Sequence, residues 1–420
     1  MGFALWILFG GLRSVGGGAG ASRRSGWVIR HAWLAGHLGL EAGGSHASLF
    51  PQKIESDGIP VVGTALNECM SGLTYESPVS ESELVSLRRR SLGLLPGAGV
   101  SGSKATAQDA LDTVSRMLAF QGQHLGGTMW SIGMRHLGLT ELDVIELFNS
   151  GQLIRTWPFR GTLHVMTPRD ASEVLSVMGP RALKTVTTRH EVAGLPEREV
   201  EQATVLFLQA AQEQGPLGRD AIADLLKQVG LEATYPQVRH FIFTLCLRNV
   251  AVWGPMMGKE QGLVPTSDAC VKTTHEPNEV FRKIVKGVVS GRGPLTVEDI
   301  AYWTSLGKGV VTSALNELGE DITWMTRVGD PRKLAVLTST LEAHDFGQPA
   351  CDIVMCAGFE ELLLGYRDRT RKGSPTVRKV QGEGHVACRT AVKTVGNSKR
   401  IQGRHSNMAV PSLFIEFYRC

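Results

Sequence analysis

RMLAFQGQHLGGTMWSIGMRHLGLTELDVIELFNSGQLIRTWPFRGTLHV, residues 116–165, is the stretch from which the fold is predicted. Within it, Thr140-x-x-Asp143 is a capping box, which marks the start of a helix, and apolar residues follow at helical spacing. LIRTW and TLHVM then read as two strands on either side of the turn Pro158-Phe159-Arg160-Gly161. Helices followed by a short hairpin are typical of a winged-helix unit.

The same pattern occurs three times along the chain. LTELDVI, LGRDAIA and LTVEDIA begin at residues 139, 217 and 295, so successive copies are 78 residues apart. Helical and strand-like runs follow each copy. We therefore predict a mainly α fold with small β wings, in the α+β class, built from three tandem winged-helix units. These units are expected at residues 81–180, 181–270 and 271–345.

Residues 346–372 are expected to begin a C-terminal β-domain, and residues 373–420 form a divergent tail. Between Arg367 and Arg404 there are 11 Lys and Arg against 2 acids, so this segment alone carries +9. The net charge of +4 therefore leaves −5 for the rest of the chain and indicates little about the folded part. Because the tail shows little strand alternation, we expect the C-terminal β-domain to be incomplete.

Residues 1–80 have no sustained helical or strand periodicity and no acidic residue before Glu41. They are rich in Gly and Ser and contain several Arg. One interpretation is a disordered or spurious leader, and the other is a transit peptide. The first predicts a cytoplasmic, nucleoid-associated protein, whereas the second places the protein in an organelle or the nucleus.

Composition argues against some classes of protein. The seven cysteines are scattered, without a C-x-x-C pair or zinc-like spacing to His, so no structural metal is expected. No run reaches the roughly 18 apolar residues that a membrane span needs. We expect no cofactor, no metal and no membrane association, and we expect a monomer.

Three segments carry a resemblance to a known family: Gln121-Gly122-Gln123, RTWPFRGTLH at residues 155–164, and GFEELLLGYRDR at residues 358–369. Over residues 84–371 the chain resembles the AlkZ-like and YcaQ-like winged-helix DNA glycosylases. The resemblance implies three winged-helix repeats, a C-terminal β-domain and the removal of bulky alkylated purines from double-stranded DNA. The AlkZ-like branch, which implies the unhooking of interstrand crosslinks, is the closer one, because Gln123 stands where the YcaQ-like branch has Asp. After Arg371 the family's remaining strands are not visible.

The resemblance makes Gln121 and Gln123 the candidate catalytic pair. The candidate recognition helix at residues 140–151 has three acids and no base, so it is poorly suited to DNA phosphates. Basic residues lie instead in the first wing and beside the glutamine segment. The candidate DNA-binding residues are Arg116, Arg135, Arg155, Arg160, Thr162, His164, Arg367 and Arg369.

Amide side chains suit the hydrolysis of an alkylated nucleotide. A purine alkylated at N7 is already cationic, so it leaves without a general acid, which otherwise contributes about 10²–10⁴-fold. A Gln amide cannot take up a proton at neutral pH, but it can hold a water and point its carbonyl dipole at the positive charge developing on the sugar. We expect Gln121 and Gln123 on an irregular loop, with Gly122 letting the backbone approach the DNA closely.

Structural interpretations exist for the same residues. Gln121 and Gln123 could cap the preceding helix or face solvent, Arg155 and Arg160 could be solvated hairpin charges, and His164 could be a packing residue. For the whole protein, the alternative is a non-enzymatic winged-helix regulator or architectural DNA-binding protein. The lack of an evident carboxylate general base leaves that alternative open.

Overall fold

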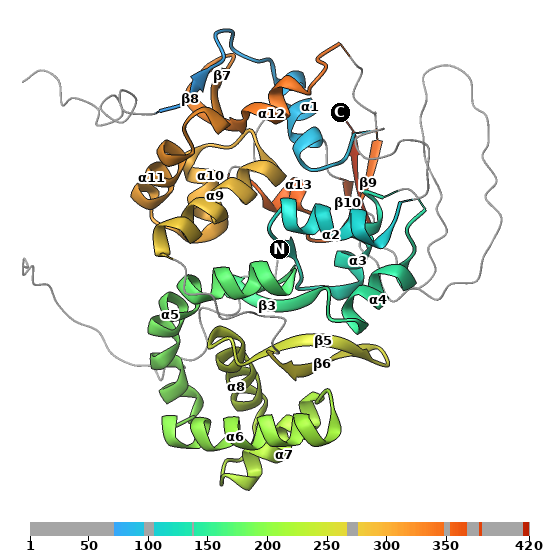
Figure 1. The fold of residues 1–420 in the computed structure, drawn as a ribbon, viewed down its shortest axis with the longest axis vertical. Helices are drawn as coiled ribbons and strands as arrows, with labels where there is room; N and C mark the ends of the chain where they lie inside the picture. Colours follow the sequence, from blue (N-terminus) through green and yellow to red (C-terminus); the bar gives the residue numbers. More distant parts are fainter. Residues whose placement is uncertain are drawn as a thin grey trace, which may run out of the picture. The chain divides into compact units, whose positions relative to one another are not determined.

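Three successive sets of helices, each followed by a two-stranded antiparallel hairpin, run through the described chain (Figure 1). The structure is a computed structural model, and it describes residues 71–95, 105–136, 138–266, 276–347, 353–367, 378–379 and 415–419. These residues all lie within one compact unit, Val61–Cys420. The fold is mixed, with helices and small, mostly antiparallel sheets, in agreement with the predicted α+β class.

The first set contains the stretch that predicted the fold. Thr140 caps a helix in a capping box with Asp143, as predicted, and Thr106 caps the preceding helix in the same way. The elements of this set are α2 (Ala107–Arg116), α3 (Leu125–Gly133), α4 (Glu141–Asn149), β3 (Ile154–Phe159) and β4 (Thr162–Met166).

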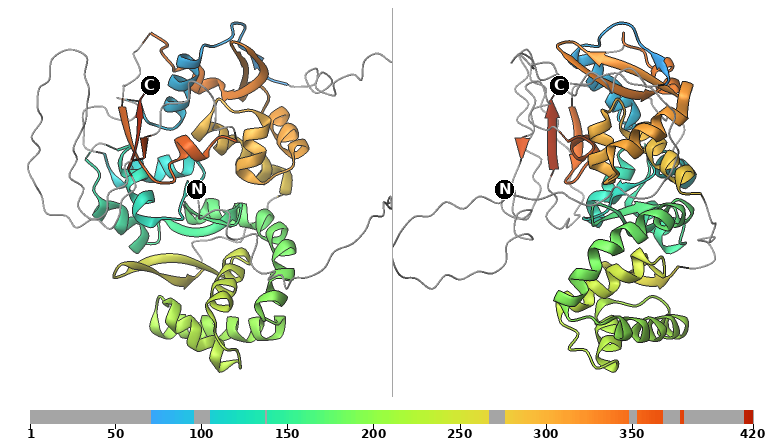
Figure 2. Two further views of the ribbon diagram at one scale, coloured as in Figure 1. Left: turned by 180° about the vertical axis from the view of Figure 1, so that it is seen from behind. Right: turned by 90° about the vertical axis from the view of Figure 1, so that its left-hand side faces the viewer.

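The other two sets follow at the predicted spacing. The second set, after the long helix α5 (Pro168–Ala193), comprises α6 (Glu197–Gln214), α7 (Arg219–Gln228), α8 (Tyr235–Leu247), β5 (Ala251–Met257) and β6 (Glu260–Pro265). The third set comprises α9 (Pro277–Arg292), α10 (Val297–Thr304), α11 (Lys308–Leu318), η1 (Gly319–Asp321), β7 (Ile322–Arg327) and β8 (Asp330–Leu337), followed by α12 (Thr338–Glu342). Both turned views keep α9, α10 and α11 beside the β7–β8 hairpin (Figure 2).

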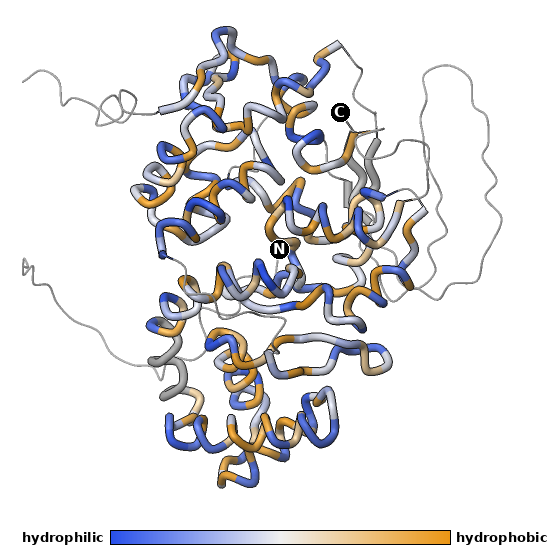
Figure 3. Tube along the Cα trace, in the orientation of Figure 1, coloured by the Kyte–Doolittle hydropathy of each residue, from blue (hydrophilic) through white to orange (hydrophobic). Residues whose placement is uncertain are grey.

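Equivalent positions of the 78-residue repeat have equivalent burial. Val144 in α4, Ile222 in α7 and Ile300 in α10 are each fully buried, which confirms the alignment of the copies at this position. Figure 3 shows hydrophobic and hydrophilic residues alternating along the helices, as expected of helices that bury one face. None of the described helices combines the length and apolar character needed to span a bilayer.

The hairpins of the first two sets belong to one sheet. Its five strands lie in the order β2-β4-β3-β5-β6, where β2 is the short strand Phe120–Gln121. The two sets join where β3 pairs with β5 and Arg155 lies opposite Trp253. The sheet therefore continues across the domain boundary that we expected at residue 180.

The fold begins earlier than the sequence suggested. Strand β1 (Leu73–Thr74) pairs in parallel with β7, and Ser80 caps helix α1 (Glu81–Ser91). Leu84 and Leu87 of α1 pack in a hydrophobic cluster with residues of β7 and β8. This corrects the expectation that residues up to 80 are a leader outside the fold, at least from residue 71 onward. The remainder of that predicted leader lies outside the described residues.

The C-terminal segment returns to the first set. Strand β9 (Ile353–Ala357) precedes the short helix α13 (Glu361–Leu364), and Cys356 and Leu362 are buried in the core of the first set. Strands β10 (Arg378–Lys379) and β11 (Ile415–Arg419) complete an antiparallel sheet in the order β10-β11-β9. Two short strands of the predicted tail thus extend the sheet begun by β9, while residues 380–414 lie outside the described part of the chain.

Candidate active site

The two glutamines occupy different environments. Gln121 lies in the edge strand β2, opposite His164 of β4, and only 8% of its surface is exposed. Gln123, two residues further on, is exposed, and its Oε1 accepts a hydrogen bond from the Leu163 N–H at 3.3 Å. The expectation of an irregular loop is therefore wrong for Gln121, because pairing with β4 holds its backbone extended.

Gly122 allows β2 to lie close to β4 and Arg155, which is a reason for a glycine here that does not involve DNA. Its N–H donates to the Leu163 carbonyl at 2.7 Å. A Cβ at this position would lie 3.1 Å from the His164 main chain and 3.2 Å from Cδ of Arg155. A side chain would therefore push β2 away from β4 and move both neighbouring glutamines.

The main chain of Gln121 is held by side chains on the side away from β4. Its N–H donates to Oε1 of Glu361 at 2.8 Å, and its carbonyl accepts from the Thr128 hydroxyl at 2.7 Å. A strand at the edge of a sheet normally leaves such groups to solvent or to another chain. Here Glu361 and Thr128 take the place of a neighbouring strand.

Glu361 is also bonded to the third set. Its Oε2 accepts from Nε of Arg292 at 2.8 Å and from the Trp303 indole N–H at 3.1 Å. Burial opposes ionisation, but the charge of Arg292 and its hydrogen bond outweigh burial and lower the pKa of Glu361 to about 2. The carboxylate is thus ionised and paired at neutral pH.

Arg292 in turn holds the segment that leads into β2. Its guanidinium donates to the carbonyls of Met117 at 3.0 Å and Ala119 at 2.6 Å, and it lies 4.0 Å from the centre of the Trp303 ring. The Tyr366 hydroxyl donates to the Arg292 carbonyl at 3.0 Å. The end of α9 is therefore fixed to both the glutamine segment and the C-terminal segment.

Glu360, the neighbour of Glu361, holds helix α3. Its Oε1 accepts from Nη2 of Arg135 at 2.5 Å, and its Oε2 accepts from the Ser131 hydroxyl at 2.6 Å. Arg135 also donates to the Leu92 carbonyl at 2.7 Å and is only 7% exposed. Because its guanidinium is buried and engaged within the protein, Arg135 does not have the geometry of the DNA contact that we predicted.

His164 is fully buried and uncharged at neutral pH. Burial, followed by the charge of Arg160, lowers the pKa of His164 to about 3. Its Nδ1 lies 2.9 Å from the Thr162 carbonyl, which can only accept, so we assign the ring hydrogen to Nδ1. The rings of Phe159 and Trp303 meet its ring edge-on. This geometry fits the packing interpretation rather than a DNA contact.

The arginines of the first hairpin are placed differently from each other. Arg155 is buried beside the glutamine segment, where its Nη1 donates to the Gly122 carbonyl at 3.2 Å, and burial lowers its pKa to about 10. Arg160 lies in the turn with a φ of 54°, and its guanidinium is 5.6 Å from the ring centre of Tyr302, which is 40% exposed. Its guanidinium is also 5.5 Å from the ring centre of the buried Trp303, and its Nε and Nη2 atoms are buried, so Arg160 is only partly exposed.

The remaining predicted DNA-binding residues are scattered. Thr162 donates to the Phe159 carbonyl at 3.3 Å inside the hairpin turn. Arg367 is exposed, and its main-chain N–H donates to Asp299 at 2.9 Å. Arg369 lies outside the described residues.

Arg116 is largely buried, which lowers its pKa to about 10, and its Nη1 donates to two main-chain carbonyls, those of Ser91 and Ser290.

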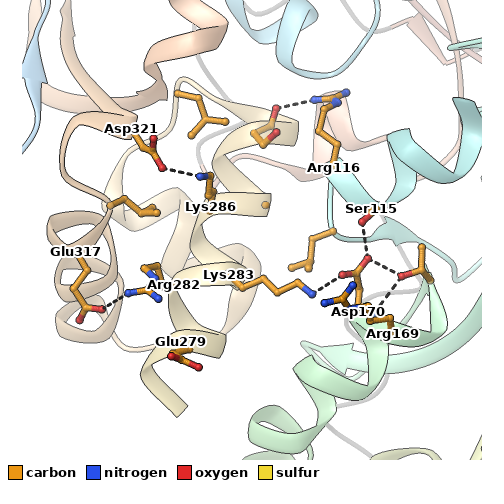
Figure 4. Close-up of a pocket in the computed structure, with 16 residues that line it drawn as sticks. Ser115, Arg116, Arg169, Asp170, Glu279, Arg282, Lys283, Lys286, Glu317 and Asp321 are labelled. Atoms are coloured by element: carbon orange, nitrogen blue, oxygen red, sulfur yellow. Dashed lines mark hydrogen bonds and ion pairs between the residues drawn. The ribbon is translucent and has the colours of Figure 1, made fainter. Parts of the chain in front are cut away.

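Arg116 also lines a charged cavity of about 740 Å³, to which neither glutamine contributes (Figure 4). The lysines that line this cavity form ion pairs with neighbouring carboxylates. Lys286 pairs with Asp321 at 2.6 Å, and Lys283 pairs with Asp170 at 2.7 Å and with Glu173. A phosphate entering here would have to displace those carboxylates, so the cavity is a poorer candidate for DNA binding than the exposed hairpin turn.

Sequence reasoning missed the buried residues that hold the glutamine segment. Glu360 and Glu361 lie within GFEELLLGYRDR, which carried the resemblance, but their roles could not be read from that pattern. Trp303 was recognisable only as an apolar position of the repeat, and no local pattern singled out Arg292. Within the described residues, no cluster of three or more His, Cys, Asp or Glu could hold a metal ion.

Comparisons with known proteins agree with the arrangement of the elements. A sequence model of the family described as "DNA glycosylase AlkZ-like" matches residues 114–380, more than half of the chain. A protein of Streptomyces sahachiroi named "Interstrand DNA cross-link repair glycosylase" is 27% identical over 273 residues, which are 62% of this chain and 72% of that protein. A solved structure named "Streptomyces sahachiroi DNA glycosylase AlkZ" covers 69% of this chain and 78% of its own, with a TM-score of 0.54 and 21% identity. The structural likeness supports the fold, and the sequence match identifies the family.

Proposed function

The chain belongs to the AlkZ-like family of DNA glycosylases, and from this premise we propose that it hydrolyses the N-glycosidic bond of N7-alkylated purines in double-stranded DNA. It is a DNA repair enzyme of the glycosylase class. The proposal extends to the unhooking of interstrand crosslinks, because the Streptomyces relative is named for that substrate and Gln123 is the residue expected of this branch.

In this proposal, Gln121 and Gln123 act on the sugar rather than on the base. The alkylated base leaves as a neutral purine once the bond to C1′ breaks, so no proton has to be supplied. The two amides orient the attacking water and stabilise the positive charge that develops on the deoxyribose. Selectivity then comes from the lability of the alkylated nucleotide, because amides alone are inadequate for a normal base.

The observation that carries the proposal is the state of the Gln121 side chain. Its Oε1 is buried and has no hydrogen-bond partner among the described residues, although the Gln121 main chain is bonded on both sides. An unpaired buried acceptor costs about 1–3 kcal/mol, and such groups need an explanation. Because this oxygen is buried, it can meet water or substrate only if the Gln121 side chain turns outward, whereas Gln123 already reaches solvent; the proposal requires that movement of Gln121.

The same proposal assigns the DNA contacts and the domains. Arg160, Tyr302 and Arg367 provide surface near the site for the DNA backbone, and we interpret the three helix and hairpin sets as winged-helix units. We propose that the protein acts as a monomer in the cytoplasm, associated with the nucleoid. The DNA contacts are assigned from the exposed positions of Tyr302 and Arg367.

The test is base release from defined DNA. Purified protein is incubated with duplex containing one N7-methylguanine, and free base and abasic sites are quantified for the wild type, Gln121→Ala and Gln123→Ala. Release by the wild type, with losses of about 10²-fold or more in either variant, is expected if each amide stabilises the transition state. Absence of release from both N7-methylguanine and a crosslinked duplex, with DNA binding intact, contradicts the proposed substrate. Full activity in both variants contradicts the proposed roles of the glutamines.

A further inference from the structure

Glu361 connects three parts of the chain that are far apart in sequence. Its two oxygens accept from the Gln121 main chain in the first set, and from Arg292 and Trp303 in the third set. The side chain is 1% exposed, so it has no surface to offer to DNA. Its position between the candidate catalytic residue and two other elements suggests that it acts through Gln121.

The geometry of β2 explains why such a contact matters. This strand is two residues long and pairs only with β4 among the described strands. The N–H of Gly122 donates to the Leu163 carbonyl of β4. The N–H of Gln121 points in the opposite direction and donates to Glu361. A strand this short has little cooperative stability of its own. The position of Gln121 therefore depends on what its outward N–H meets.

We propose that Glu361 is a positioning residue for the glycosylase reaction, which fixes the Gln121 main chain relative to Gln123 and makes base release depend on the C-terminal segment. The inference rests on the proposed function, in which Gln121 contacts the substrate. Glu361 itself takes no proton and forms no bond to DNA. A charged acceptor suits this task, because hydrogen bonds to carboxylates are about twice as strong as neutral ones.

Glu360 provides a matched control within the same segment. Both carboxylates are 1% exposed or less, and each pairs with a buried arginine, Arg135 for Glu360 and Arg292 for Glu361. Each also accepts from a second side chain. Breaking either pair leaves a buried arginine without its counter-ion, so both variants are expected to lose stability. Glu361 differs from Glu360 in accepting from the Gln121 main chain and in pairing with Arg292, which holds the segment before β2.

The experiment compares Glu361→Gln with Glu360→Gln in the full-length protein. Single-turnover base release from N7-methylguanine DNA is measured with enzyme in excess, well below the melting temperature of each variant, beside the DNA dissociation constant. Glu361→Gln is expected to slow release by about 10-fold or more, because small displacements of a catalytic group can cost up to 10²-fold. Its DNA affinity is expected to stay close to that of the wild type. Equal losses of rate in the two variants at equal folded fraction would overturn the proposal.

Hydrogen exchange gives a readout that does not depend on activity. The peptide containing Gln121 is expected to exchange faster in Glu361→Gln than in the wild type or Glu360→Gln. If the wild type releases no base, the proposed function fails, and exchange still decides whether Glu361 holds Gln121. Unchanged exchange in folded Glu361→Gln contradicts the positioning role.

A second variant covers the case in which Glu361→Gln fails to fold. Glu361→Asp keeps a negative charge near Arg292 but shortens the side chain by one methylene. Lost protection of the Gln121 peptide together with slower release supports the proposal. Lost protection with an unchanged rate overturns it, because Gln121 would then work equally well without its anchor.

Discussion

Gln121 and His164 lie opposite each other in the pairing of β2 with β4, so their side chains leave the sheet on the same face. His164 is closed in by Phe159 and Trp303, and Trp303 also donates to the carboxylate that holds Gln121. The candidate site is therefore built on a buried layer in which a neutral imidazole, an indole and an ion pair are packed together. Its polar groups can be tested one at a time.

The first prediction concerns the loss of folding stability at acidic pH that the buried His164 causes. The pKa of His164 is about 3 in the folded protein and near 6.5 in the unfolded chain, so below pH 6.5 only the unfolded state takes up this proton. Stability is therefore lost as the pH falls from 6.5 toward 3, with a limiting slope of about 1.4 kcal/mol per pH unit. In urea unfolding between pH 7 and 5, His164→Asn should show a flatter dependence than the wild type.

His136 and His344 also have lowered pKa values, chiefly because of burial, and both contribute to the slope of the wild type. Since they are unchanged in the variant, the difference between the two slopes reports His164. Identical slopes would mean that the pKa of His164 is the same in the folded and unfolded states, contrary to its lowering by burial.

The second prediction separates the two atoms of the Gln123 amide. Gln123→Glu keeps an acceptor for the Leu163 N–H and places negative charge near the sugar, but it loses the amide donor. If the acceptor oxygen dominates, this variant should release base at least about 10-fold faster than Gln123→Ala. Equal rates for the two variants would indicate that the amide N–H group of Gln123, rather than its oxygen, contributes to catalysis. The measurement is single-turnover release at saturating enzyme.

The sequence revealed the local parts of this site but not their connections. Capping at Thr140 and the buried positions Val144, Ile222 and Ile300 were predictable, because they depend on residues within one or two turns. The family resemblance was also predictable from three segments, and the family match confirms it. The bond between Gln121 and Glu361 joins residues 240 positions apart, and such a contact leaves no periodicity to detect. Strand β2 was missed for the same reason, since its partners are all distant.

The third prediction concerns salt-dependent DNA binding. Arg160 is partly exposed in the hairpin turn, and the proposed function assigns it one phosphate contact, which would be lost in Arg160→Gln. The dissociation constant should rise, and the slope of log affinity against log salt should fall in magnitude by about 0.9. Arg135→Met is the control, because Arg135 is buried with Glu360 and should alter stability without altering that slope. A change of slope in Arg135→Met instead would place the DNA on a different surface.

The last prediction concerns the contact between α9 and the segment that leads into β2. A Cβ on Gly291 would lie 2.9–3.0 Å from three atoms of Met117, so this helix approaches closely only because it carries no side chain there. Gly291→Ala should destabilise the protein by about 1–3 kcal/mol, the usual cost of overpacking, and should slow base release by displacing the segment before Gln121.

Gly309 in α11 is the matched control, because a Cβ there meets nothing within 4 Å. Gly309→Ala should be neutral or stabilising by about 0.4–1 kcal/mol, since it reduces the entropy of the unfolded chain. Thermal melts and single-turnover rates distinguish the two. A Gly291→Ala variant as stable and as active as Gly309→Ala would show that α9 can move away from Met117 without disturbing the glutamine pair, and the packing of the third set would then have no part in positioning the site.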